Sequence, residues 1–133
     1  MNDIAFRQAS LNGKLAVVKY LLSHGADIHA GNDSALINSS IYGNLAVVEC
    51  LIENGANVNA HDNYALKYAS YSGHLDVVKF LISHGADVHA ENDFALRWAT
   101  KHNYQDIVEC LISHGASKSS FNYYYRYIKS LFK

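Results

Sequence analysis

Eight histidines are the residues of this 133-residue chain with the most obvious chemical potential. Imidazole is a common metal ligand and titrates near neutral pH. Two positions, repeated at a spacing of thirty residues or a multiple of it, hold most of them: His24, His84 and His114 at one, His29 and His89 at the other. Packed helices lie about 8–10 Å apart, so residues one repeat apart cannot converge on an ion with bonds of about 2 Å. Asn54 and Asn59 fill the same positions in the second repeat. This pattern predicts hydrogen-bonding roles in turns, with no metal and no cofactor.

Acid–base chemistry is the second possibility. Asp93 and Arg97 are four residues apart, as are Asp3 and Arg7, and this spacing brings side chains together on a helix surface. A helix cap with a salt bridge explains such a pair better than a catalytic acid and base. The sequence also lacks the Gly-x-Ser-x-Gly, His-Glu-x-x-His and phosphate-loop motifs. We therefore expect no catalytic residues and no enzyme activity.

The two cysteines, Cys50 and Cys110, occupy one repeat position, two repeats apart. Their separation should be about 20 Å, whereas a disulfide needs Cα atoms within about 7 Å. We expect two small core side chains in a reducing compartment. The apolar run 15–22 is interrupted by Lys19 and lacks a cationic leader, and no stretch reaches the roughly 18 apolar residues of a membrane span. The sequence thus predicts an intracellular, cytoplasmic protein.

All these residues are positioned by one segment that occurs four times. Residues 74–87 read HLDVVKFLISHGAD, and variants of this segment occupy 14–27, 44–57 and 104–117. A fixed period of this length predicts stacked repeats, each of which buries its apolar side against its neighbours. The predicted single domain, 1–133, consists of repeats 2–31, 32–61, 62–91 and 92–121 and a C-terminal capping helix, 122–133.

Each repeat predicts two helices and a return segment. A polar pair such as Asn92-Asp93 is expected to cap the first helix, which runs from about Phe94 to His102. A Gly or Asn then allows the left-handed turn into an apolar second helix, and Ala86–Ala90 is expected to return in extended form. One solvent-side position of the second helix alternates in charge, which predicts ion pairs between repeats: Lys19, Glu49, Lys79 and Glu109.

Charge divides the chain into an acidic body and a basic tail. Residues 1–116 contain 7 Lys or Arg against 12 Asp or Glu, whereas 117–133 contain four basic residues and no acid. The tail is also aromatic at 123–127, so binding of nucleic acid or a membrane surface is an alternative function. Four charges make a small footprint, and the capping helix is the favoured interpretation. Nucleic acid is therefore disfavoured as a partner.

The motif 73–82 (GHLDVVKFLI) with 85–88 (GADV) resembles the ankyrin repeat, and the resemblance covers about nine-tenths of the chain. The period is 30 instead of the usual 33. The Thr-Pro-Leu-His opening is absent, and the missing residues fall where ankyrin repeats project a β-hairpin. The pattern at 90–99 looks most like the expanded ankyrin families of giant viruses of amoebae, which implies the cytoplasm of an infected host cell. The resemblance implies an all-α ankyrin-repeat solenoid with shortened connections that recognises a protein without catalysis.

In the ankyrin arrangement the first helices line the concave side. Their outward face is aromatic where a solvated helix would be polar, as at Tyr64 and Phe94. The predicted partner-binding residues are Tyr42, Tyr68, Tyr71, Trp98, Lys101 and His102. The acidic body favours a basic or neutral protein partner. The outer face of the first repeat, with Ile4 and Phe6, is only partly polar, which predicts weak self-association through that end.

Overall fold

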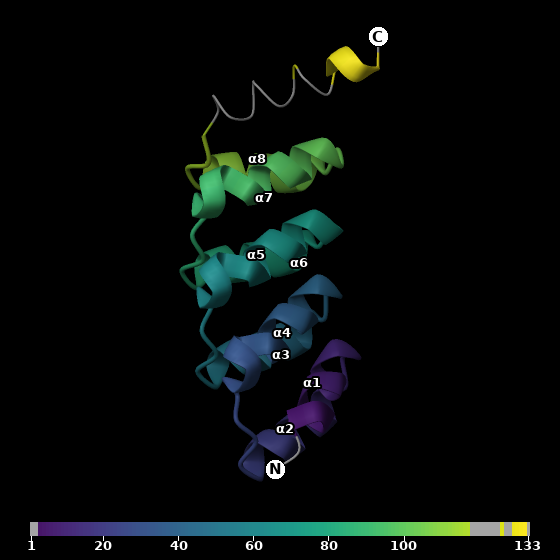
Figure 1. The fold of residues 1–133 in the computed structure, drawn as a ribbon, viewed down its shortest axis with the longest axis vertical. Coiled ribbons are helices and arrows are strands. Elements are labelled where there is room, and N and C mark those ends of the chain that lie inside the picture. Colours follow the sequence, from purple (N-terminus) through teal and green to yellow (C-terminus); the bar gives the residue numbers. More distant parts are fainter. Residues whose placement is uncertain (1–2, 118–125, 127–128, 133) are drawn as a thin grey trace.

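The computed structural model of the chain describes residues 3–117, 126 and 129–132. Residues 3–117 form eight helices and no strand: α1 (Asp3–Leu11), α2 (Leu15–Ser23), α3 (Ala30–Ile41), α4 (Leu45–Glu53), α5 (Ala60–Ser72), α6 (Leu75–Ser83), α7 (Ala90–Lys101) and α8 (Gln105–Ser113). Successive pairs of helices stack in chain order along the long axis of the molecule (Figure 1). The predicted all-α solenoid of helix–turn–helix repeats is confirmed. None of the described helices has the length and apolar character needed to cross a bilayer.

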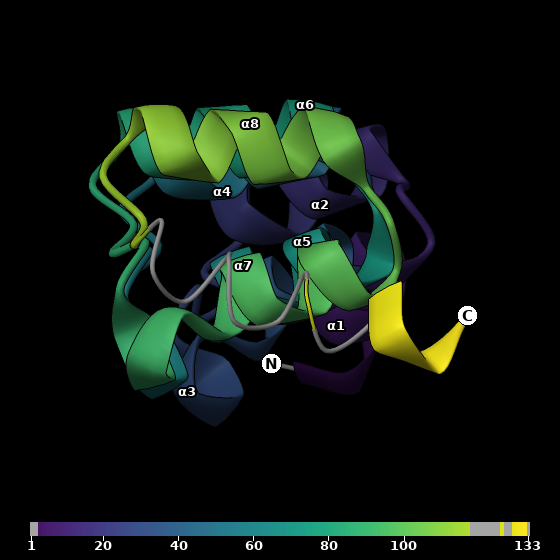
Figure 2. The same ribbon diagram turned by 90° about the horizontal axis from the view of Figure 1, so that it is seen from above.

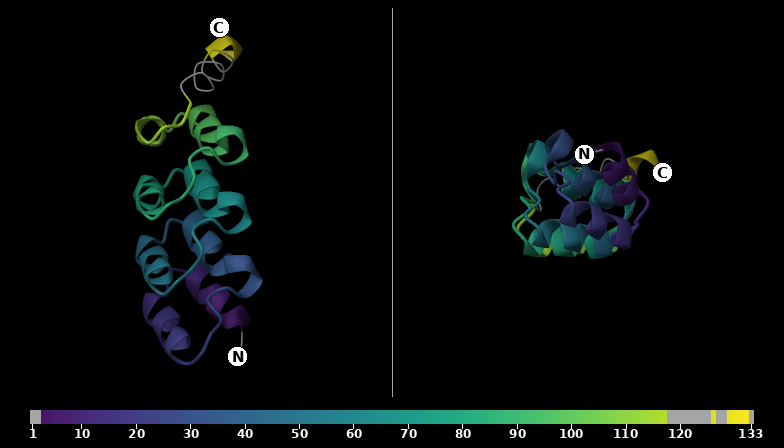
Figure 3. Two further views of the ribbon diagram at one scale, coloured as in Figure 1. Left: turned by 90° about the vertical axis from the view of Figure 1, so that its left-hand side faces the viewer. Right: turned by 90° about the horizontal axis from the view of Figure 1, so that it is seen from below.

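The helices form two rows. One row contains α1, α3, α5 and α7, and the other contains α2, α4, α6 and α8, as the views along and across the stack show (Figures 2 and 3). Neighbouring helices of the α1 row pack more closely on one another than those of the α2 row do. A stack with one closer row curves toward that row, so the α1 row lies on its inner side.

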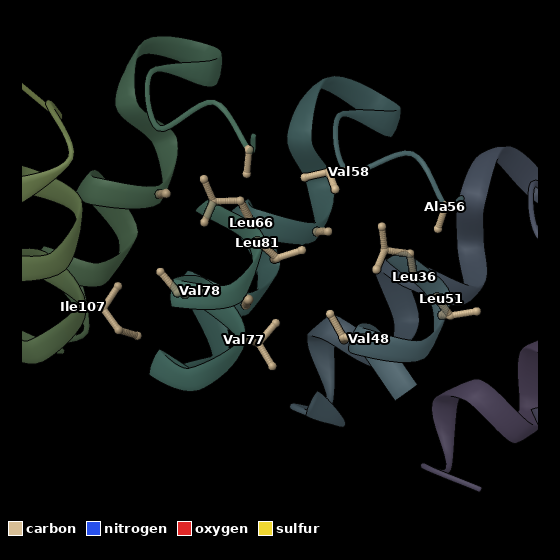
Figure 4. Packing of buried hydrophobic residues seen from close by; sticks show 14 of the residues in the cluster. Leu36, Val48, Leu51, Ala56, Val58, Leu66, Val77, Val78, Leu81 and Ile107 are labelled. Carbon is tan, nitrogen blue, oxygen red and sulfur yellow. The ribbon is translucent and has the colours of Figure 1, made fainter. Parts of the chain in front are cut away.

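The core fills the space between the two rows and between successive pairs. Each helix of the two central pairs contributes one leucine that is at most 1% exposed: Leu36, Leu51, Leu66 and Leu81. In the close-up, Leu66 of α5 and Leu81 of α6 point into this space beside Val77 and Val78 (Figure 4). Burying such a side chain stabilises the fold by about 1.5–3 kcal/mol. Cys50 and Cys110 are buried free thiols, as predicted.

The three residues that follow each of Ala30, Ala60 and Ala90 form a left-handed turn. Their φ angles lie between 50° and 63°, and the three turns are Gly31-Asn32-Asp33, His61-Asp62-Asn63 and Glu91-Asn92-Asp93. Gly, Asn and Asp tolerate this backbone best. The prediction that the polar pairs cap the helices was wrong for Asp33 and Asn63. Their side chains accept hydrogen bonds from the backbone N–H groups of Asn57 (2.8 Å) and Asp87 (2.9 Å), 24 residues later in the same repeat.

The connection between repeats is compact. The return at 86–90 is not extended throughout, because residues 88–89 form a turn in which Asp87 Oδ1 accepts from the His89 N–H at 2.9 Å. A tight turn joined to a left-handed turn needs fewer residues than a hairpin. This explains the thirty-residue period.

The repeated histidines and asparagines bond within these turns, as predicted. At the first shared position, the side chain contacts the carbonyl oxygen four residues earlier: His24 with Tyr20 (2.8 Å), Asn54 with Cys50 (2.7 Å), His84 with Phe80 (3.0 Å) and His114 with Cys110 (2.8 Å). At the second position, each side chain holds the buried residue of the left-handed turn: His29 with Asp33 (3.0 Å), Asn59 with Asn63 (2.9 Å) and His89 with Asp93 (3.0 Å).

Two other expectations have different outcomes. The alternating residues Lys19, Glu49, Lys79 and Glu109 form no ion pair with one another within the part of the chain that the structure describes, so that prediction was wrong. These side chains belong to the outer row, whose helices pack less closely on one another. The predicted cap, 122–133, lies mostly outside the described residues. Leu131 and Phe132, which are described, are exposed.

Candidate functional site

Aromatic side chains gather on the exposed face of α5 and α7. Tyr64, Tyr68 and Tyr71 follow one another at four and three residues in α5, which places them on one side of the helix. Phe94, Trp98 and His102 follow one another at four residues along α7 and its C-cap. We call these six residues the aromatic strip.

The strip is continuous across the two repeats. Within α5 the Tyr64–Tyr68 and Tyr68–Tyr71 ring centroids are 5.4 and 6.3 Å apart, and within α7 those of Phe94 and Trp98 are 5.8 Å apart. Tyr71 joins the helices, because its ring lies 5.2 Å from Trp98 and 5.0 Å from His102. The Tyr64–Tyr68, Tyr68–Tyr71 and Tyr71–His102 pairs meet edge to face. Such contacts stabilise a pair by about 0.5–1.5 kcal/mol beyond area burial. The rings therefore fix one another's positions.

The structure brings five of the six predicted site residues together. Tyr68 and Trp98 are half-buried, Tyr71 is 40% exposed, and Lys101 and His102 are exposed. Tyr42 is at the C-terminal end of α3 and is 58% exposed, but it makes none of the ring contacts found among the described residues. Its role in binding stays a prediction.

Two further rings extend the strip, and the sequence analysis did not include them. His61 stacks on Tyr64 with centroids 5.2 Å apart, and Tyr104 stacks on His102 with centroids 5.7 Å apart. Both belong to turns, where helical spacing gives no guide to direction. The positions equivalent to Tyr104 hold Lys14, Asn44 and His74, so the repeat pattern did not predict a tyrosine ring at this position.

A buried cation supports the turn-proximal end of the strip and was also missed. Lys67 in α5 is 1% exposed, and its Nζ lies 2.7 Å from Glu91 Oε1 and 3.8 Å from Asp62 Oδ2. The same Nζ is 4.6 Å from the Tyr64 ring centroid and 5.6 Å from that of Phe94. The Lys67 ammonium holds the pKa of the Glu91 carboxyl below its usual value. The pair joins two different repeat positions 24 residues apart, so the spacing within a repeat gave no signal of it.

The opposite end of the strip is basic. Lys101 Nζ lies over the Trp98 ring at 4.3 Å from its centroid, and His102 is beside it. Past the left-handed turns, the residues of α5 and α7 include Lys67, Arg97 and Lys101 but no Asp or Glu. Because Lys67 is buried and paired, Arg97 and Lys101 give this face a positive charge, in contrast to the acidic body.

The side chains of this arrangement can make noncovalent contacts with another molecule. Ring edges, tyrosine hydroxyls and two basic side chains can contact an apolar surface and polar acceptors. The described Cys–His contact is elsewhere, on α8, where Cys110 Sγ is 4.0 Å from His114 Nδ1. Burial raises the pKa of the Cys110 thiol.

Comparison with known proteins agrees with the geometry. A family model described as "Ankyrin repeats (3 copies)" matches residues 6–92 and, in an overlapping second match, residues 65–122. A search of the curated proteins found no match.

Proposed function

Because the chain belongs to the ankyrin-repeat family, whose members generally serve as non-enzymatic protein-interaction modules, we propose that it binds a protein partner on the aromatic strip and does not catalyse a reaction. The observation that carries the proposal is the continuous ring surface on α5 and α7, which remains partly exposed at Tyr71 and is bordered by Lys101 and His102. The inner row offers this surface in a fold whose connections are compact turns.

Aromatic side chains suit this role for an energetic reason. They provide a large contact area and have few rotatable bonds, and they dominate the residues whose truncation weakens protein complexes. The ring contacts within the strip order these side chains before a partner arrives. This lowers the entropy cost of binding.

The test begins with affinity capture from cells that make the protein naturally, followed by mass spectrometry to identify the partner. Trp98→Ala and Tyr71→Ala should each weaken binding of the purified partner by about 2 kcal/mol or more. Circular dichroism should show that both variants remain folded. Tyr20→Ala is a matched control, because Tyr20 is an exposed tyrosine of the outer row. Trp98 is the single tryptophan, so its fluorescence reports docking directly.

Unchanged affinity in both folded variants would contradict the proposal and leave the rings with a stacking role alone. Tyr42→Ala measures how far the surface extends, since Tyr42 lies two helices from Trp98 in the inner row.

A further inference from the structure

The strip has different polarities at its two ends. At the turn end, Lys67 is neutralised by Glu91 and Asp62. Lys101 is seven residues from Phe94, about 10 Å farther along α7. No ion pair among the described residues includes Lys101, whose contact is with the Trp98 ring. A positive charge with no carboxylate partner thus borders the exposed end of the strip, where Tyr71 and His102 lie.

We propose that the strip binds an acidic segment of its protein partner, with a carboxylate against Lys101 and His102 and a neighbouring apolar side chain against Tyr71 and Trp98. This inference rests on the proposed function and specifies the chemistry of the partner. The proposed partner segment is acidic, whereas the net charge of the chain suggests a basic or neutral partner. Electrostatic attraction near contact depends on the charge of the local face and not on the total charge.

The ring geometry favours an acidic peptide over a nucleic acid. Stacking of bases requires open ring faces. Lys101 lies over Trp98, and His102 stacks beside it at an interplanar angle of 22°. The Trp98 face covered by Lys101 is therefore closed to a base, whereas the edge of an aromatic ring carries the positive part of its quadrupole, which attracts carboxylates.

Selection of short random peptides on the full-length protein tests the proposal. Peptides that also bind the Trp98→Ala variant are discarded, so the remaining peptides report on the strip. We expect them to be enriched in Asp or Glu next to an aromatic or aliphatic residue. A selected peptide and its copy with Asn and Gln in place of the acids are then titrated, with Trp98 emission as the readout. The amide copy should bind about tenfold more weakly, with less dependence on salt.

Charge reversal supplies the matched comparison. Lys101→Glu should remove the preference for the acidic peptide, whereas Lys79→Glu, at an exposed lysine of the outer helix α6, should leave it unchanged. A single-stranded oligonucleotide should leave Trp98 emission unaltered.

Peptides that depend on Trp98 but show no acidic enrichment would overturn this inference and leave the proposed function intact. The same conclusion would follow if Lys101→Glu and Lys79→Glu behaved alike. A response of Trp98 to the oligonucleotide in place of the peptides would assign the strip to nucleic acid. Recovery of no Trp98-dependent peptide would contradict both proposals together.

Discussion

Asp33, Asn63 and Asp93 are the residues on which the joints between repeats depend. Each is buried with a positive φ in a left-handed turn. Asp33 and Asn63 also accept a backbone N–H from the return segment at the end of the same repeat. Only Asp and Asn combine a tolerance of this backbone with an acceptor oxygen so close to the chain. The residue four positions earlier also bonds to each of these side chains. It is a histidine where the turn has Asp33 or Asp93, and an asparagine where the turn has Asn63.

Two substitutions of Asn63 should therefore distinguish how much its backbone conformation and its hydrogen bond each contribute to the unfolding free energy. Asn63→Gly tolerates the positive φ but leaves the Asp87 N–H without its acceptor, a loss of about 1–3 kcal/mol in unfolding free energy. Asn63→Ala should lose about 1–2 kcal/mol more, because alanine is strained in the left-handed region. Urea unfolding measures both changes.

Asn63→Asp is the control, since Asp occupies the equivalent positions 33 and 93 and keeps the acceptor. Equal stability of the Gly and Ala variants would show that the backbone at this position is not strained.

At the scale of elements, Lys67 couples α5 to the turn that opens α7. A buried ammonium is costly unless it is paired, and here Glu91, Asp62 and two ring faces surround it. Glu91 faces Lys67, Asp62 and Arg97. Because Lys67 lowers the pKa of Glu91 in the folded state, the unfolded chain binds more protons in the acidic range. The pair stabilises the fold above the usual Glu91 pKa of 4.5, and this contribution is lost as the pH falls below it.

Lys67→Met should make the unfolding free energy less sensitive to acid than in the unaltered protein. At neutral pH this variant should be as stable or more stable, because a flexible apolar side chain fills the same space without a charge to desolvate. Glu91→Gln should lower stability at neutral pH, since it leaves the Lys67 ammonium with the more distant Asp62 alone. Urea unfolding between about pH 3 and pH 7 tests both.

Glu53→Gln serves for comparison, because Glu53 is exposed on α4 and outside the ion pairs of the described residues. An acid dependence that is identical with and without Lys67 would refute the coupling.

At the scale of the whole molecule, the two ends of the described stack are unequal. Val17 in α2 is 47% exposed, whereas its equivalents Val47, Val77 and Ile107 are at most 1% exposed because the preceding helices cover them. Ile4 and Tyr20 are exposed on the same pair of helices. A surface that is buried in the other repeats is thus open to solvent here, and solenoids need polar outer faces to stay apart.

We expect weak self-association through this end, detected by sedimentation velocity as a rise in average mass with concentration. Val17→Asp should abolish it. Ala16→Asp, the neighbouring exposed position where the third repeat already has Asp76, should leave it unchanged. A strict monomer at high concentration would rule the association out.

The sequence by itself determined the all-α solenoid and most of its core. Apolar residues at helical spacing, repeated every thirty residues, allow only one register, in which Leu66, Leu81 and their equivalents are buried. It also determined that the outward face of the first helices is aromatic. These features depend on spacing within a single repeat, which is local and can be read along the chain.

Only the tertiary structure decided which side-chain contacts form around the junctions between repeats. It placed Asp33 and Asn63 in left-handed turns, buried Lys67 against Glu91, and joined Tyr71 to Trp98 while leaving Tyr42 outside the ring contacts described. The ion pairs predicted between the alternating charges of the outer row do not form among the described residues. Asn and Asp serve a helix cap and a left-handed turn equally well, so the sequence could not choose between them. Contacts between repeats depend on how closely neighbouring helices approach, and that distance is set by the packing of the whole stack.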